Sequence, residues 1–70
     1  MNFFESLERI KEILYLYKRY EEQKQTYIKR GLEIKNLERT QNNLLEELKE
    51  LVGERSIEKA QQLLLEHGVE

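Results

Sequence analysis

The large apolar residues between positions 10 and 52 fall into two groups, and this spacing constrains the fold more than any other feature. They crowd residues 10–20 and residues 44–52 and are sparse between them. Read outward from Gly31, the two groups mirror each other, with Ile10, Ile13, Leu14 and Tyr17 on one arm and Leu51, Leu48, Leu45 and Leu44 on the other. A chain that folds back near Gly31 brings the groups together and leaves the polar middle at the bend. The pattern predicts an antiparallel helical hairpin.

A helix stop signal stands at the expected bend. Lys29 and Arg30 suit the negative end of a helix dipole, and Gly31 suits the left-handed residue that follows a helix. Tyr27 and Leu32 then occupy the two positions whose side chains meet in a Schellman motif. We therefore expect the first helix to end here, with a positive φ at Gly31.

One uninterrupted helix as far as Val52 is the alternative to the hairpin. The heptad register of such a helix is interrupted by polar residues at Gln23, Arg30 and Gln41. Gly31 inside a helix also costs about 1 kcal/mol. A helix of about 50 residues would also be about 75 Å long and stable only as a coiled coil. The residues favour the hairpin without excluding the long helix. The heptad register that supports the alternative has Ile13, Tyr20, Tyr27, Ile34 and Leu48 at a, and Leu16, Leu37, Leu44 and Leu51 at d.

Capping residues indicate the boundaries of the first two helices. Asn2 with Glu5 forms a variant of the capping box, so the first helix is expected at about 3–30. The second helix, expected at about 32–52, has only Asn36 as a good N-cap. Gly53 should end it.

The third helix is short, at about 56–67. Ser56 is the expected N-cap, and Gly68 follows the last turn as its left-handed residue. Val69 would then contact Leu64. The face expected to pack on the hairpin consists of Ile57, Ala60, Leu63 and Leu64.

Composition favours a helical chain that associates. The 70 residues include no Pro, no Asp and no Cys, and 37% are charged while 39% are hydrophobic. A chain this short buries a small core, and without Cys it has neither disulfides nor thiolate metal sites. We expect an all-α protein, a single domain over residues 1–70, with an antiparallel helical hairpin and a short third C-terminal helix. It should associate into a helical-bundle or coiled-coil-like oligomer, most simply a homodimer.

Catalytic and metal-binding motifs are missing from the sequence. His67 is the only histidine, and three short helices offer little of the orienting partner and enclosed pocket that a general base needs. A cluster of glutamates interleaved with a lysine is typical of a solvated helix face rather than a carboxylate metal site. We expect no enzyme, no cofactor, no metal site and no small-molecule substrate. The glutamates are Glu46, Glu47, Glu50 and Glu54.

A membrane location is not favoured. The longest unbroken apolar run, residues 13–17, is far shorter than the roughly 20 residues of a membrane span. Glu5, Glu8 and Arg9 interrupt the apolar N-terminus, so no signal peptide is expected. We expect a cytoplasmic protein with no membrane partner.

The first helix has a row of apolar residues beside basic ones that the hairpin core does not need. Tyr and Arg are enriched at binding hot spots, because they combine large contact area with a polar end. The predicted partner-binding surface consists of Leu16, Tyr20, Lys24, Tyr27 and Arg30. We expect a small non-enzymatic protein–protein interaction module, an adaptor or a regulatory protein that binds through a helical face.

The alternative function is a small nucleic-acid-binding regulator. Residues 18–39 carry a local charge of +3 and contain tyrosines, and aromatic rings beside cations can stack bases and bind phosphates. Glu21 and Glu22 would repel the phosphate backbone. Nucleic acid is therefore the less favoured partner.

Overall fold

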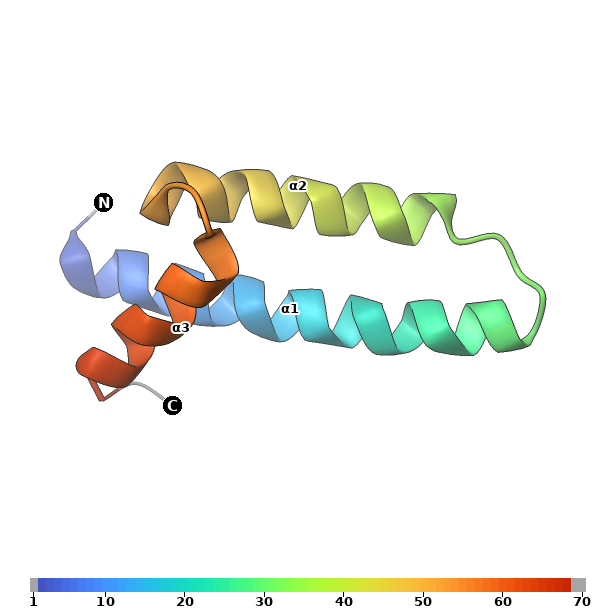
Figure 1. Ribbon diagram of the computed structural model, residues 1–70, viewed down its shortest axis with the longest axis horizontal. Helices are drawn as coiled ribbons and strands as arrows, with labels where there is room; N and C mark the ends of the chain where they lie inside the picture. Colours follow the sequence, from blue (N-terminus) through green and yellow to red (C-terminus); the bar gives the residue numbers. More distant parts are fainter. Residues whose placement is uncertain (1, 69–70) are drawn as a thin grey trace.

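The computed structural model describes residues 2–68, which form three helices. α1 (Phe3–Lys29) and α2 (Lys35–Val52) run antiparallel, and α3 (Ser56–Glu66) packs against both. Figure 1 shows α3 beside the half of the hairpin that holds the N-terminus, whereas the half near the bend consists of α1 and α2 alone. The molecule measures 41 × 21 × 19 Å. The all-α class is confirmed, and α1 and α2 form the predicted hairpin.

The bend is built on a Schellman motif at Gly31. Gly31 has a φ of 70°, and its N–H donates to the carbonyl of Ile28 at 3.1 Å. The N–H of Leu32 donates to the carbonyl of Tyr27 at 2.9 Å. These are the two hydrogen bonds of the motif, with Arg30 as the C-cap. The positive φ predicted at Gly31 is confirmed, and α1 ends here rather than continuing as one long helix.

The N-caps of the hairpin confirm one prediction and correct another. Asn2 Oδ1 accepts a hydrogen bond from the N–H of Glu5 at 2.8 Å, and the Glu5 carboxylate accepts one from the N–H of Asn2, which completes the predicted capping box. Asn36 is wrong as the N-cap of α2. Ile34 holds that position and makes no side-chain capping bond. The start of α2 lies at the exposed bend, where water can hydrate its first N–H groups.

The start of α3 also differs from the prediction. Arg55 rather than Ser56 is the N-cap, and Ser56 is the first helical residue. Residues 53–55 reverse the chain, with a φ of 86° at Gly53 and of 55° at Arg55. Because this short reversal places a left-handed residue directly before the helix, Ser56 already has the helical conformation and cannot cap it.

Glycines end α2 and follow α3. Gly53 is the C-cap of α2, as predicted. Gly68 follows the last turn of α3 with a φ of 67°. Val69, which was expected to contact Leu64, lies outside the described residues.

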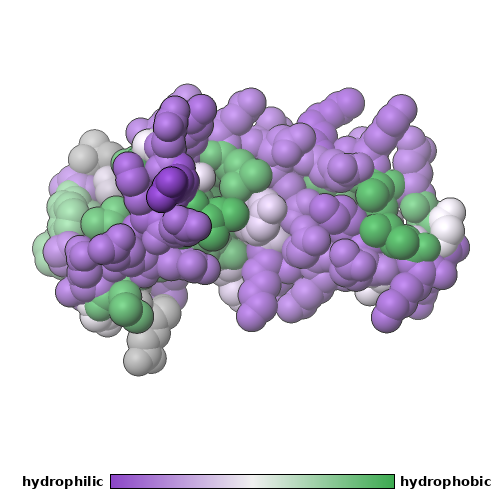
Figure 2. Space-filling model, viewed as in Figure 1, coloured by the Kyte–Doolittle hydropathy of each residue, from purple (hydrophilic) through white to green (hydrophobic). Residues whose placement is uncertain are grey.

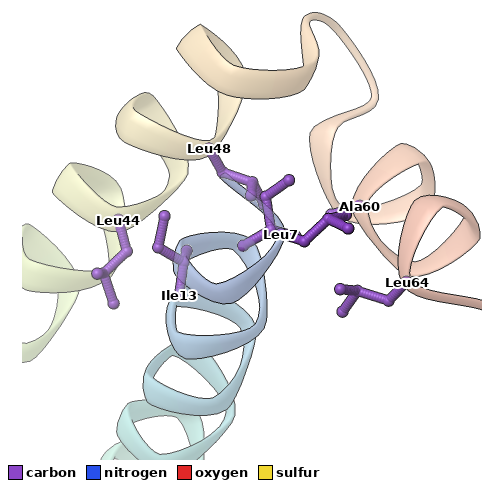
Figure 3. Packing of buried hydrophobic residues seen from close by; sticks show 7 residues of the cluster. Leu7, Ile13, Leu44, Leu48, Ala60 and Leu64 are labelled. Atoms are coloured by element: carbon purple, nitrogen blue, oxygen red, sulfur yellow. The ribbon is translucent and has the colours of Figure 1, made fainter. Parts of the chain in front are cut away.

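The core lies where the three helices meet (Figure 3). Ile13 and Leu48 are its largest fully buried side chains, one from each arm of the hairpin. Ala60 is also fully buried, and its small side chain allows α3 to approach the hairpin closely. The other buried apolar residues are Leu7, Ile10, Leu44 and Leu64.

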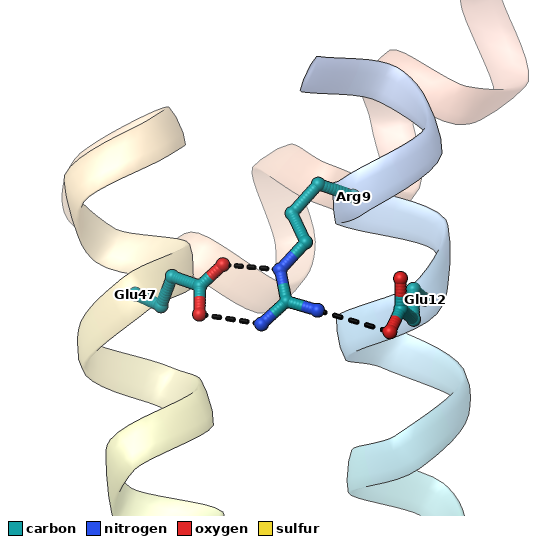
Figure 4. A network of polar contacts seen from close by, with 3 residues as sticks. All are labelled: Arg9, Glu12 and Glu47. Atoms are coloured by element: carbon teal, nitrogen blue, oxygen red, sulfur yellow. Dashed lines mark hydrogen bonds and ion pairs between the residues drawn. The ribbon is translucent and has the colours of Figure 1, made fainter. Parts of the chain in front are cut away.

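Two polar contacts define the register of α1 against α2. Arg9 forms a bidentate ion pair with Glu47, with Nη2 at 2.6 Å from Oε1, and Arg9 Nη1 lies 3.0 Å from Glu12 (Figure 4). The Arg9 guanidinium holds the pKa of Glu47 below its ordinary value. Nearer the bend, the buried amide of Gln41 donates to the Glu21 carboxylate at 2.9 Å. A shift of one helix by a turn would break both contacts.

Replacing Gly31 tests the bend. Nothing lies within 4 Å of a Cβ added at Gly31, so the effect of Gly31→Ala is confined to its left-handed backbone. We expect this change to lower the free energy of unfolding by about 1–2 kcal/mol, whereas in a continuous helix it would raise it by about 1 kcal/mol. Gly31→Asn is the matched control and should destabilise less, because Asn tolerates this conformation better. Urea unfolding measures all three chains, and an Ala variant more stable than the parent would contradict the bend.

Candidate functional site

The five residues predicted to bind a partner divide between the hairpin seam and the solvent. Leu16 and Tyr20 are partly buried and pack against the core. Helical spacing explains their position, because both lie within about 60° of Ile13 around α1. Leu16 and Tyr20, which were predicted to bind a partner, therefore pack within the hairpin.

The other three residues of the predicted surface lie nearer the bend. Lys24 Nζ is 3.2 Å from the Glu21 carboxylate, which also accepts a hydrogen bond from Gln41. The Gln41 hydrogen bond and the Lys24 contact lower the pKa of Glu21 from its ordinary value. Tyr27 and Arg30 are exposed. Of the five predicted residues, these two offer the most surface to a partner.

Tyr15 and Arg19 extend this exposed surface towards the N-terminus. Arg19 Nη1 donates a hydrogen bond to the Tyr15 hydroxyl at 3.1 Å, and the guanidinium carbon lies 5.9 Å from the centre of the tyrosine ring. Both side chains are exposed, Tyr15 by 58%. The hydrogen bond raises the pKa of Arg19 above its ordinary value. The pair is thus ordered before any partner arrives.

These exposed residues form one continuous side of α1. We call this side the outer face of α1. A shallow depression of about 560 Å³ lies along it between Tyr15 and Tyr27. Its residues recur every three or four positions, which places them on one side of a helix. They are Tyr15, Arg19, Gln23, Tyr27 and Arg30.

The predicted site omitted Tyr15 and Arg19, although the sequence holds a signal for them. Tyr15 lies about 200° around the helix from Ile13, so it cannot share the direction of the core. Arg19 lies four residues after Tyr15, at the spacing of a side-chain pair on one helix face. Counting angles from the most buried residue would have found both.

The remaining candidates for chemistry lie apart from the outer face of α1. The ring of His67 packs edge-on against Phe3, with centroids 4.7 Å apart, at the end of the molecule away from the bend. Among residues 2–68, no group of three or more His, Cys, Asp or Glu side chains is placed to hold a metal ion. In the same part of the chain, none of the helices has both the length and the apolar character needed to cross a membrane.

Two tyrosine substitutions separate the hairpin seam from the outer face of α1. Tyr20→Ala removes a ring that packs on the core and should lower the free energy of unfolding by about 2 kcal/mol. Tyr15→Ala removes an exposed ring and should change it by less than about 0.5 kcal/mol. Thermal and urea unfolding measure both variants. Equal destabilisation by the two changes would contradict the assignment of these faces.

The outer face of α1 combines two aromatic rings, two guanidinium groups and an amide on a helix that the core holds in place. Such side chains give contact area and hydrogen-bond donors. Comparison with protein-family models, curated proteins and solved structures finds no match to this chain.

Proposed function

We propose that this chain is a small non-enzymatic interaction module that binds another protein through the outer face of α1. The observation that carries the proposal is the exposed Tyr15–Arg19 pair, aligned with Tyr27 and Arg30 along one helix. Tyr and Arg are the side chains most enriched at binding hot spots, together with Trp. The partner should present carboxylate or carbonyl groups to the guanidiniums and apolar surface to the rings.

The fold reduces the conformational entropy that this surface loses when it binds a partner. α1 is 27 residues long and is held by α2 along its length and by α3 at one end, so its backbone does not have to fold on binding. Arg19 is already held against Tyr15, which reduces the side-chain entropy lost when a partner contacts them. These two features favour a helix presented as a rigid binding surface.

A nucleic-acid-binding function has one observation in its favour. The same outer face lies in or beside the basic stretch 18–39, where rings and cations stand close together. Glu22 also lines the depression and would repel phosphates. A mobility-shift assay in a salt series, with single-stranded and double-stranded nucleic acid, tests this alternative. Binding that weakens steeply with salt and is lost with Arg19→Ala would favour it over the protein partner.

Removing the two exposed rings tests the protein-binding proposal. Wild-type chain and the Tyr15→Ala/Tyr27→Ala variant are immobilised separately and used to capture proteins from nuclease-treated lysate of the source cell. We expect the proteins held by the wild-type chain to be depleted at least tenfold by the double variant, since anchors of this type contribute about 2 kcal/mol or more.

The matched control is Phe4→Ala, which removes an aromatic ring that is 77% exposed but lies about three turns of α1 before Tyr15, beyond the depression. It should capture the same proteins as the wild-type chain. If the double variant and the wild-type chain retain the same proteins equally well, the outer face is not the binding surface.

A further inference from the structure

The fold sorts the charges of the chain into two ends. The bend half, residues 18–39, holds seven Lys/Arg and four Glu, which gives +3. The rest of the described chain, residues 2–17 and 40–68, holds five Lys/Arg and nine Glu, which gives −4. The hairpin brings these two acidic segments together, since Arg9 meets Glu47. The molecule is 41 Å long, several times the Debye length of about 8 Å, so its two ends interact with solution independently.

The third helix covers only the acidic end. Helical spacing places Lys18 and Ile28 within about 40° of Leu14 around α1, on the side towards α3. We call this side of the hairpin, together with α3, the α3 side. Near the bend it has no helix on top of it, so the molecule is thick at its acidic end and thin at its basic end (Figure 1).

An apolar groove lies at the step where α3 begins. It has a volume of about 570 Å³ and lies between α1 and α3. Lys11 and Lys18 line it, and neither forms an ion pair within residues 2–68. The apolar side chains that line the groove are Leu14, Tyr15, Tyr17, Ile57 and Leu64.

Exposed apolar residues lie at both ends of the molecule as well. Ile28 and Leu32 are each 51% exposed near the bend, and Leu65 on α3 is 83% exposed. Figure 2 shows apolar surface next to α3 and again near the bend, with a hydrophilic band between them. Apolar patches at the two ends and opposite charges at the two ends match a partner of the same length and inverted polarity.

We propose that a second copy of this chain covers the α3 side in an antiparallel, two-fold symmetric arrangement. The α3 of each copy lies on the bend half of the other, in the position that its own α3 leaves open. Each +3 end then meets a −4 end, twice per dimer, because a two-fold interface repeats every contact. The grooves lie near the two-fold axis, and Leu65 of one copy approaches Ile28 and Leu32 of the other.

The size of the α3 side fits this arrangement. A standard interface buries about 800 Å² on each partner, and a side 41 Å long and about 20 Å wide can provide it. Of the outer face of α1, Tyr15 also lines the groove and lies at the edge of the proposed interface, whereas Arg19, Gln23, Tyr27 and Arg30 do not line it and stay exposed. The dimer therefore goes beyond the proposed function and would present two copies of that face to a partner.

Charge reversal with restoration tests the arrangement. The bend variant, Lys18→Glu/Lys29→Glu, places acidic residues on the basic end, and the α3 variant, Glu58→Lys/Glu66→Lys, places basic residues on the acidic end. Sedimentation equilibrium should show that each variant weakens wild-type dimerisation at least tenfold in low salt. The chain with all four changes should regain it, because residues 18 and 29 of one copy again face residues of opposite charge at 58 and 66 of the other, although the net charges of the two ends become −1 and 0. Far-UV circular dichroism checks that each variant keeps its helices.

The matched control is Lys35→Glu/Arg39→Glu, which makes the same charge change in the bend half on exposed positions of α2 turned away from Gln41. It should reduce dimerisation by less than threefold. Leu65→Gln, at a position with 83% exposure, should weaken dimerisation at least fivefold without unfolding the chain, and it serves if a charge variant does not fold.

Four results would overturn the antiparallel two-fold dimer. Two concern the wild-type chain: it stays monomeric at high concentration, or its association strengthens as salt is raised. The other two concern the variants: the four-change chain does not regain dimerisation, or the Lys35→Glu/Arg39→Glu control dimerises as weakly as the bend variant. None of them bears on the outer face of α1, whose test is the capture experiment with Tyr15 and Tyr27. The two proposals therefore fail separately.

Discussion

The burial of Ile13 and Leu48 in one core is the constraint on which the rest of the structure depends. They are the largest fully buried side chains, and each comes from a different arm of the hairpin. A core of this size in a chain without disulfides supplies roughly 3–5 kcal/mol, so every element that joins it matters. α3 adds Ala60 and Leu64 to the same place. The core is thus concentrated at one end, and the bend half has only two helices.

This concentration explains which surfaces are available. Near the bend the two helices cover each other on one side only, so Tyr27, Ile28 and Leu32 stay exposed. At the other end α3 uses the apolar side of the hairpin and leaves an open groove beside Ile57. Of the outer face of α1, Tyr15 and Arg19 lie about 120–160° around the helix from Ile13, whereas Tyr27 lies within about 40° of Ile13 and is exposed by 37% because it is near the bend. The proposed binding surfaces are therefore a consequence of a small core placed off centre.

Polar contacts give the hairpin a single alignment where apolar contacts alone would allow sliding. Gln41 is 4% exposed, and its amide donates to the Glu21 carboxylate at 2.9 Å and to the Tyr17 carbonyl at 3.3 Å. No buried side-chain nitrogen or oxygen lacks a hydrogen bond within residues 2–68. Because an unpaired buried amide costs about 1–3 kcal/mol, other registers are disfavoured. Arg9 and Glu47 add an ion pair towards the opposite end, which contributes less because both side chains are partly exposed.

The sequence predicted those features that depend on local chemistry or on one-dimensional spacing. The mirrored apolar arms predicted the hairpin, and the residues around Gly31 predicted its bend, because a left-handed glycine needs no knowledge of distant neighbours. The caps at Asn36 and Ser56 failed for the opposite reason. Where α2 and α3 begin depends on how the bend and the reversal at Arg55 place the chain in three dimensions.

The candidate site was predictable only in part for a similar reason. Tyr27 and Arg30 were recognised as exposed, but Leu16 and Tyr20 lie on the side of α1 that meets α2. A row of apolar residues on a helix does not show how wide an arc its neighbours will cover. The sequence showed the +3 of residues 18–39, but the gathering of acidic residues at the opposite end appears only when residues 2–17 lie beside α2 and α3.

The most direct test of the hairpin is a distance between its two arms. Spin labels attached through Glu8→Cys and Glu50→Cys are exposed and introduce the only cysteines of the chain. With excess unlabelled chain present, pulsed electron paramagnetic resonance then reports the distance between the two labels of one molecule. Helices packed about 8–10 Å apart predict one population below about 30 Å, label arms included. A population near 63 Å, the length of about 42 residues of continuous helix, would contradict the hairpin and every surface derived from it.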